Sequence, residues 1–130
     1  MSVTTVWQLG GIAVGGALGA VLRYLVSNGV YQWLGRDFPL GTLVVNVSGS
    51  FLMGLLSVFL LDKLSLGAEW RGIIFVGFLG AFTTFSTFSL ETVFLLENEA
   101  WLKALVNSVG SVLLCVGFCW VGIWVGRLSV

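Results

Sequence analysis

Long apolar stretches separated by short polar connections dominate the pattern of this 130-residue chain. They run from about Val6 to Val26, with a helical pattern that can extend to Trp33, then Leu40 to Leu61, Trp70 to Leu96 and Leu102 to Val125. A helix needs about 20 residues to cross the hydrocarbon core of a bilayer. The runs are too continuous for the alternating strands of a barrel. The pattern therefore predicts four transmembrane helices, folded as one domain over residues 1–130.

Composition supports a membrane environment. Hydrophobic residues make up 58% of the chain, charged residues 9%, and the mean hydropathy is +1.05. A soluble chain of this size would need many more polar side chains to cover its surface. Six basic and six acidic residues leave no basic face for binding nucleic acid. Residues 1–22 contain no Lys or Arg, so the first stretch is expected to be a retained helix rather than a signal peptide.

Positive charges flank the predicted helices almost evenly. Lys63, Arg71 and Arg127 lie on the amino-terminal side of the membrane, and Arg36 and Lys103 lie on the other. Because basic loops set orientation, this balance favours insertion in both orientations. Two opposite copies could then form an antiparallel homodimer, which would supply the inverted repeat that the chain lacks. The alternative is that the one extra charge sets a single orientation.

Small residues recur at helical spacing. Glycines stand four apart on the first span, at Gly11, Gly15 and Gly19. The same spacing occurs on the last span, at Gly122 and Gly126. Such spacing lets helix backbones approach closely in lipid. Cys115 and Cys119 share one helical face in an apolar run and are interpreted as packing residues.

The stretch from Gly77 to Glu91 differs from an ordinary membrane helix. Five hydroxyl side chains occupy the seven positions 83–89, interleaved with phenylalanines. Phe82, Phe85 and Phe88 are spaced by three, so a regular helix would stack them on one side. Phenyl edges carry partial positive charge, and beside hydroxyl donors they could replace part of the hydration of an anion.

A break in this third helix is also predicted. Gly77, Gly80 and the pair Thr83–Thr84 all weaken a continuous helix. A break frees backbone carbonyls that must find partners inside the membrane, and a bound cation is one such partner.

Other polar residues within the apolar runs are candidate functional groups, because burying them in a membrane is costly. They are Arg23 on the first span; Thr42, Asn46 and Ser50 on the second; and Lys103, Asn107 and Ser111 on the last. Arg23 either snorkels to the interface or lines a water-filled vestibule that attracts anions. The polar residues of the second span stand four apart, as do those of the last span, so each set lies on one face of its helix. Each set either lines a polar path or forms hydrogen bonds between helices.

Catalytic constellations are missing from the sequence. There is no His, no phosphate-binding loop and no pair of carboxylates, since Glu91 is the sole acid well inside a span. The chain is therefore predicted not to be an enzyme, and conduction or transport of a small ion fits better.

Three motifs give the chain a resemblance to the CrcB, or Fluc, family of fluoride channels. They are residues 15–24, GGALGAVLRY; residues 41–46, GTLVVN; and residues 77–91, GFLGAFTTFSTFSLE, which is the most specific. The resemblance covers nearly the whole chain. It implies a dual-topology homodimer in a bacterial inner membrane, with two antiparallel pores that let fluoride leave the cytoplasm passively.

Individual site residues are carried over from this resemblance. It implies that Phe85 and Phe88 are pore phenylalanines, that Asn46 is the central pore amide, and that Ser86 and Thr87 belong to a hydroxyl cluster between the rings. Further residues are expected along the same path: Arg23, Thr42, Glu91, Asn107 and Ser111. The resemblance also implies a structural sodium ion on the dimer axis, bound by the backbone carbonyls of Gly80 and Thr83.

The chain departs from the family in one respect. Some members carry a Tyr near the start of the fourth span, whereas this chain has none after Tyr31. Lys103 or Asn107 is expected to occupy that part of the path.

Two other functions compete with a fluoride channel. One is a proton-coupled exporter similar to the small multidrug resistance family, in which Glu91 would be the only candidate carboxylate. The other is a non-conducting assembly subunit, against which the polar lines on three helices argue.

Overall fold

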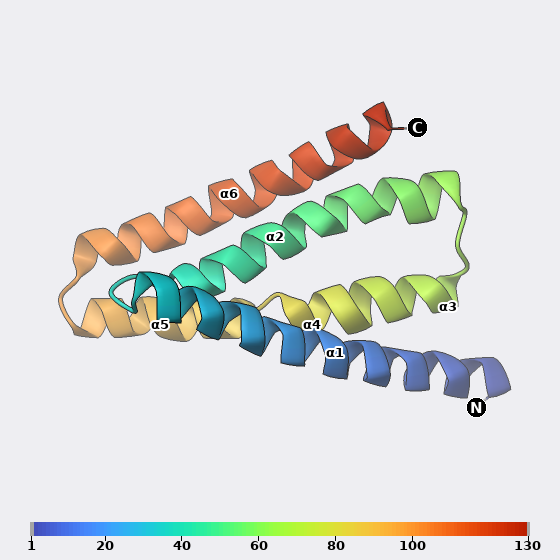
Figure 1. Ribbon diagram of the computed structural model, residues 1–130, viewed down its shortest axis with the longest axis horizontal. Helices are drawn as coiled ribbons and strands as arrows, with labels where there is room; N and C mark the ends of the chain where they lie inside the picture. Colours follow the sequence, from blue (N-terminus) through green and yellow to red (C-terminus); the bar gives the residue numbers. More distant parts are fainter. Residues whose placement is uncertain (1, 130) are drawn as a thin grey trace.

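Four long helices make up the computed structural model, which describes residues 2–129 (Figure 1). The spans cover residues 3–34, 40–63, 68–97 and 101–128, and each is long and apolar enough to cross a membrane. The predicted all-α architecture is therefore confirmed. The first span extends well beyond Val26 and ends at Leu34.

Two of the four spans are composite. Helix α1 (Val3–Leu34) and helix α6 (Trp101–Leu128) are continuous, whereas α2 (Leu40–Leu56) continues as the π-helical η1 (Ser57–Lys63). The third span contains α3 (Ala68–Arg71), the π-helical η2 (Gly72–Leu79), α4 (Gly80–Phe82) and α5 (Phe85–Glu97). The predicted break in the third helix is confirmed, and it falls between α4 and α5.

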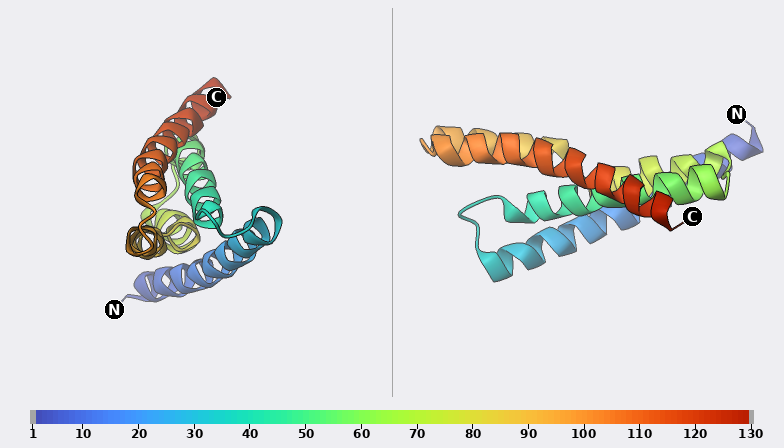
Figure 2. Two further views of the ribbon diagram at one scale, coloured as in Figure 1. Left: turned by 90° about the vertical axis from the view of Figure 1, so that its left-hand side faces the viewer. Right: turned by 90° about the horizontal axis from the view of Figure 1, so that it is seen from above.

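The helices pack mainly in two pairs. Helix α2 lies along α6, and α1 lies along η2 and α4 (Figure 2). The beginning of α1 and the end of α6 lie at the same end of the molecule, as an even number of crossings requires (Figure 1).

Glycines allow the closest approaches in both pairs. A Cβ on Gly54 of α2 would meet the Cys119 carbonyl of α6, and one on Gly122 would meet the Phe51 carbonyl. In the other pair, Gly19 of α1 faces the Phe78 carbonyl. The predicted role of the spaced glycines is confirmed, because a side chain at these points would separate the backbones.

Most large apolar side chains point outward. Val45 and Leu79 are fully buried, whereas all six tryptophans are at least half exposed: Trp7, Trp33, Trp70, Trp101, Trp120 and Trp124. Lipid is as apolar as leucine, so outward-facing apolar side chains are expected in a membrane. The few buried groups lie where polar residues of different helices meet.

Candidate functional site

The break in the third span is held by a side chain from α2. Thr83 and Thr84 are extended, with ψ of 159° and 121°. Asn46 Nδ2 donates to the Thr84 carbonyl at 2.8 Å, and the Thr84 N–H donates to Asn46 Oδ1 at 2.7 Å. The amide thus pairs with both backbone groups of Thr84, as a neighbouring peptide would. Without it, two polar groups would be unpaired in the middle of the membrane.

The hydroxyl side chains start the next helix. Thr84 Oγ1 accepts from the Thr87 N–H at 3.2 Å and donates to Thr87 Oγ1 at 3.1 Å, while Ser86 Oγ lies 3.4 Å away. Thr84 is therefore the N-cap of α5. Thr83 Oγ1 instead donates to the Leu79 carbonyl behind the break.

The phenylalanines divide into two pairs, which corrects one expectation. Phe82 and Phe85 do not stack on one side, because the two residues between them are not helical. Phe82 is buried and stacks on Phe78, with ring centroids 6.5 Å apart. Phe85 is 77% exposed and pairs with Phe88 at 5.4 Å, the rings tilted by 43°. Phe82 thus ends the helix before the break, and Phe85 begins the helix after it and shares a cavity with Asn46.

A carboxylate cluster lies toward the end of the molecule where α1 meets α2. Glu91 Oε1 accepts from the Tyr31 hydroxyl at 3.0 Å and from Thr42 Oγ1 at 2.9 Å. The Thr42 N–H also donates to the Tyr31 hydroxyl at 3.3 Å. Among the described residues, no group bonds to Glu91 Oε2, although that oxygen is buried. The cluster therefore brings together one helix end, one helix start and the third span.

Arg23 faces a small cavity rather than the molecule's end. The cavity has a volume of about 320 Å³, and its polar lining comes from α1, α2 and the start of α5: Arg23, Tyr24, Ser27, Thr42, Thr84 and Thr87. Both interpretations of Arg23, snorkelling and lining a water-filled vestibule, stay predictions. The cavity thus connects the residues of the break with Thr42 of the carboxylate cluster.

Polar residues of α6 contact the third span. Asn107 is 2% exposed and donates through Nδ2 to Thr92 Oγ1 at 2.9 Å. Ser111 Oγ donates to Asn107 Oδ1 at 3.4 Å, and Thr92 donates to the Phe88 carbonyl at 2.8 Å. The line from α6 therefore ends at the backbone of Phe88.

Two further cavities lie at either side of this polar region. Ser50 shares one of about 400 Å³ with Asn46, Thr83, Phe85 and other residues. Lys103 lines the other, of about 600 Å³, and its Nζ donates to the Asp37 carbonyl at 3.3 Å. We call this second cavity the vestibule; Tyr31, Arg36, Asp37, Glu91, Asn98 and Lys103 are its polar lining residues. Lys103 is thus at the vestibule, apart from the buried Asn107.

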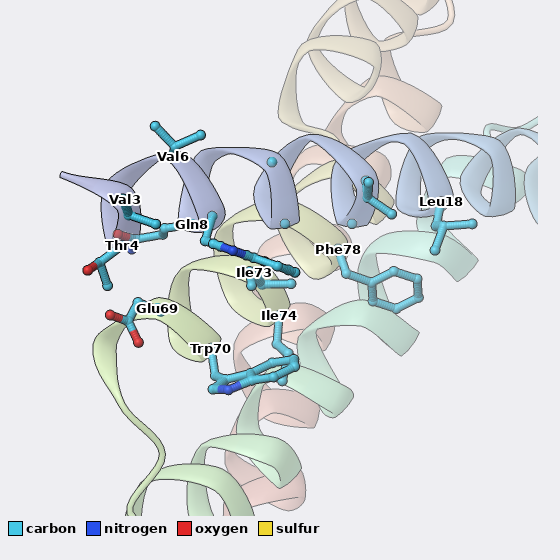
Figure 3. A pocket seen from close by; sticks show the side chains of 15 residues that line it. Val3, Thr4, Val6, Gln8, Leu18, Glu69, Trp70, Ile73, Ile74 and Phe78 are labelled. Atoms are coloured by element: carbon cyan, nitrogen blue, oxygen red, sulfur yellow. The ribbon is translucent and has the colours of Figure 1, made fainter. Parts of the chain in front are cut away.

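A further, mostly apolar cavity holds none of these groups. It measures about 1000 Å³ and lies between the first half of α1 and η2, where Ile73, Ile74, Trp70 and Phe78 line it (Figure 3). Its surface is almost wholly apolar, with Glu69 at one end (Figure 3). In a membrane-spanning chain such a groove faces lipid or another apolar surface, so it is not the candidate site.

Sequence reasoning missed Tyr31 and Thr92. Tyr31 is a single polar group where α1 meets the third span, and Thr92 is one on the third span where it meets α6. Neither residue stands in a recognisable motif. The available signal for Tyr31 was its place near the end of an apolar run, because a buried phenol needs a hydrogen-bond partner.

The chain is similar over most of its length to a known protein family. A family model described as CrcB-like protein, Camphor Resistance (CrcB), matches residues 11–123. A Magnetococcus marinus protein named fluoride-specific ion channel FluC is 54% identical over 93% of this chain and 98% of its own length. A Hydrogenovibrio crunogenus protein of the same name is 52% identical over 94% of this chain and 92% of its own length.

A Methylococcus capsulatus relative, again named fluoride-specific ion channel FluC, is 60% identical over 89% of the chain. The match spans only 51% of that relative's length. The other two relatives are matched almost from end to end. On the family model and these identities, the chain belongs to the CrcB-like family.

Proposed function

We propose that this protein is a fluoride-selective channel of a bacterial plasma membrane, through which fluoride leaves the cytoplasm passively. The observation that carries the proposal is the broken third span, whose extended residues are bound by Asn46 and followed at once by the Phe85–Phe88 pair. The family relatives that carry the name of a fluoride-specific channel support the same function and a non-enzymatic role.

The proposed path follows the polar contacts described above. Phe85, Phe88 and Asn46 form its centre, with the hydroxyls of Ser86 and Thr87. Thr42, Arg23 and Glu91 lie toward the vestibule, and Asn107 and Ser111 support Phe88 from α6. A weakly basic anion such as fluoride can be solvated by hydroxyl and amide donors together with ring edges. No fixed cation at the centre is needed to hold it.

Two copies in opposite orientations would complete the protein. In one copy, Phe85 and Ser86 are exposed at mid-membrane depth, as is Gly80. Polar groups exposed to lipid are costly, so an antiparallel partner covering this face is the simplest remedy. The positive charges are divided almost evenly between the two sides of the membrane, which permits such a pair.

A structural sodium ion fits the same face. In a continuous helix the Thr84 N–H would bond to the Gly80 carbonyl, but here it bonds to Asn46. The Gly80 and Thr83 carbonyls are therefore proposed as oxygen ligands, and a second copy would add two more. A bound sodium ion would be the partner that these carbonyl oxygens need inside the membrane, and it would hold the broken helices of the two copies together.

A proton-coupled exporter is less consistent with the site. Such a mechanism needs a carboxylate in a roomy pocket open to organic cations. Here Glu91 Oε1 already accepts two hydrogen bonds, and Oε2 is buried.

Fluoride efflux from liposomes tests the proposal directly. Purified protein should release trapped fluoride without a proton gradient, and a fluoride electrode gives the rate. Phe85→Ile and Phe88→Ile should abolish release, since they keep apolar bulk and remove the ring edges. Chloride-loaded liposomes are the control, and equal passage of chloride, or no passage of fluoride, would refute the channel.

A further inference from the structure

Tyr31 both lines the vestibule and bonds to the Glu91 carboxylate. Its hydroxyl donates to Glu91 Oε1 at 3.0 Å, across 60 residues of sequence. The face of its ring carries the guanidinium of Arg36, whose Cζ lies 4.5 Å from the ring centroid. Arg36 is steadied in turn by Asn28, whose Oδ1 accepts from Nη2 at 3.1 Å.

The cluster has only a small number of hydroxyl hydrogens that can bond to the Glu91 carboxylate. The Tyr31 and Thr42 hydroxyls have one hydrogen each, and both hydrogens are directed at the same carboxylate oxygen. Their own 3.3 Å contact therefore adds no further donor for Glu91. The other oxygen is buried without a donor among the described residues. The carboxylate thus stays in place through these two bonds alone.

We infer that Tyr31 is a positioning residue for conduction, which holds the Glu91 carboxylate against Thr42 at the wall of the anion path, so that its charge does not turn into the path. This role presupposes the fluoride channel function proposed above. Without the phenol hydroxyl, only Thr42 would hold the carboxylate. The carboxylate, which lines the vestibule, would then be free to turn further into it, where water, Arg36 and Lys103 offer partners. A free negative charge at the entrance would repel fluoride.

Tyr31→Phe is the direct test, because it removes the hydroxyl and keeps the ring beneath Arg36. We expect fluoride efflux from liposomes to slow on the order of tenfold, the factor expected when a hydrogen bond to a charged group is lost. Trp33→Phe is the matched control, since Trp33 is an aromatic residue of the same helix end and is 90% exposed. An unchanged rate in Tyr31→Phe would overturn the inference.

Repeating the Tyr31→Phe test in the Glu91→Gln variant separates a positioning role from a simple loss of structure. In Glu91→Gln there is no charge to control, so adding Tyr31→Phe should alter the remaining rate by less than about twofold. The same tenfold loss in both backgrounds would mean that Tyr31 acts only on the fold, and would also overturn the inference.

Chemical labelling gives a readout that does not depend on flux. A water-soluble carbodiimide with an added amine should modify Glu91 severalfold faster in Tyr31→Phe than in wild type, as measured by mass spectrometry. The other five acids serve as the internal reference: Asp37, Asp62, Glu69, Glu97 and Glu99. Equal labelling in both proteins would contradict the positioning role. A wild type that conducts no fluoride would refute the channel, while the labelling comparison would still test the hold on Glu91.

Discussion

At the scale of single residues, side chains of this protein take the place of missing backbone partners. Asn46 binds both peptide groups of Thr84. In the same way, the hydroxyls of Thr42 and Tyr31 supply hydrogen bonds to one carboxylate oxygen of Glu91. In lipid, unpaired polar groups have no water to turn to. The same residues that would meet an anion therefore also maintain the local structure.

Asn46→Ala should affect both stability and conduction. It leaves the Thr84 N–H and carbonyl without partners, at a cost of about 1–3 kcal/mol for each group. We expect a lower midpoint in SDS unfolding titrations and loss of fluoride efflux. Ser48→Ala is the control, because Ser48 Oγ bonds only to carbonyls of its own helix. Wild-type stability in Asn46→Ala would show that water or another group replaces the amide.

At the scale of helices, the break and the glycine contacts determine how the third span passes the others. Helix α5 starts afresh after two extended residues, with Thr84 as its N-cap. Ahead of the break, η2 and α4 lie against α1, whose glycines admit them closely. The two halves of the span therefore pack against different neighbours.

Thr84→Ala should weaken the start of α5. The Thr87 N–H loses its acceptor, and replacing a threonine N-cap by alanine costs about 0.5–2 kcal/mol. We expect faster amide hydrogen exchange at residues 85–88 in detergent. Thr84→Ser keeps the hydroxyl and should exchange like wild type. If serine and alanine gave the same exchange, the cap would not be what starts this helix.

Gly54→Ala should separate α2 from α6. The new Cβ would meet the Cys119 carbonyl, a backbone atom that cannot rotate away. Overpacking of this kind costs about 1–3 kcal/mol, so the thermal unfolding midpoint in detergent should fall. Gly117→Ala is the control on α6, because nothing lies within 4 Å of the position of its Cβ. An equal fall in both variants would contradict the contact, because helix propensity by itself favours alanine over glycine.

At the scale of the whole molecule, charge and exposure are the two observations that support the proposed antiparallel pair. The vestibule and the carboxylate cluster are built within a single chain. The face with Phe85 and Ser86 at mid-depth lacks a cover. Proposed pairing with an inverted copy would bury this face, and it requires that both orientations occur in the membrane.

Added charge should test dual topology. Leu64→Lys with Ser129→Lys adds two positive charges at the end that already carries three, and should force one orientation. Gln32→Lys with Leu34→Lys adds them at the opposite end. Each double variant alone should lose fluoride efflux, and co-expression of the two should restore it. Full activity of either variant alone would refute the antiparallel dimer.

The sequence by itself determined the four spans, the ends of the last three to within a few residues, and the break in the third. These features depend on local composition: apolar runs of sufficient length, and glycine and threonine where a helix is weak. The Phe82–Phe85 stacking was wrong for a related reason, since a helical spacing rule does not apply across a break.

Only the tertiary structure decided which side chains meet. Asn46 reaches Thr84 across 38 residues, and Tyr31 reaches Glu91 across 60. Such contacts depend on how far α1 extends past Val26 and on how closely glycines let helices approach. Neither quantity can be read from hydropathy, because a helix end and a crossing distance result from packing rather than from composition.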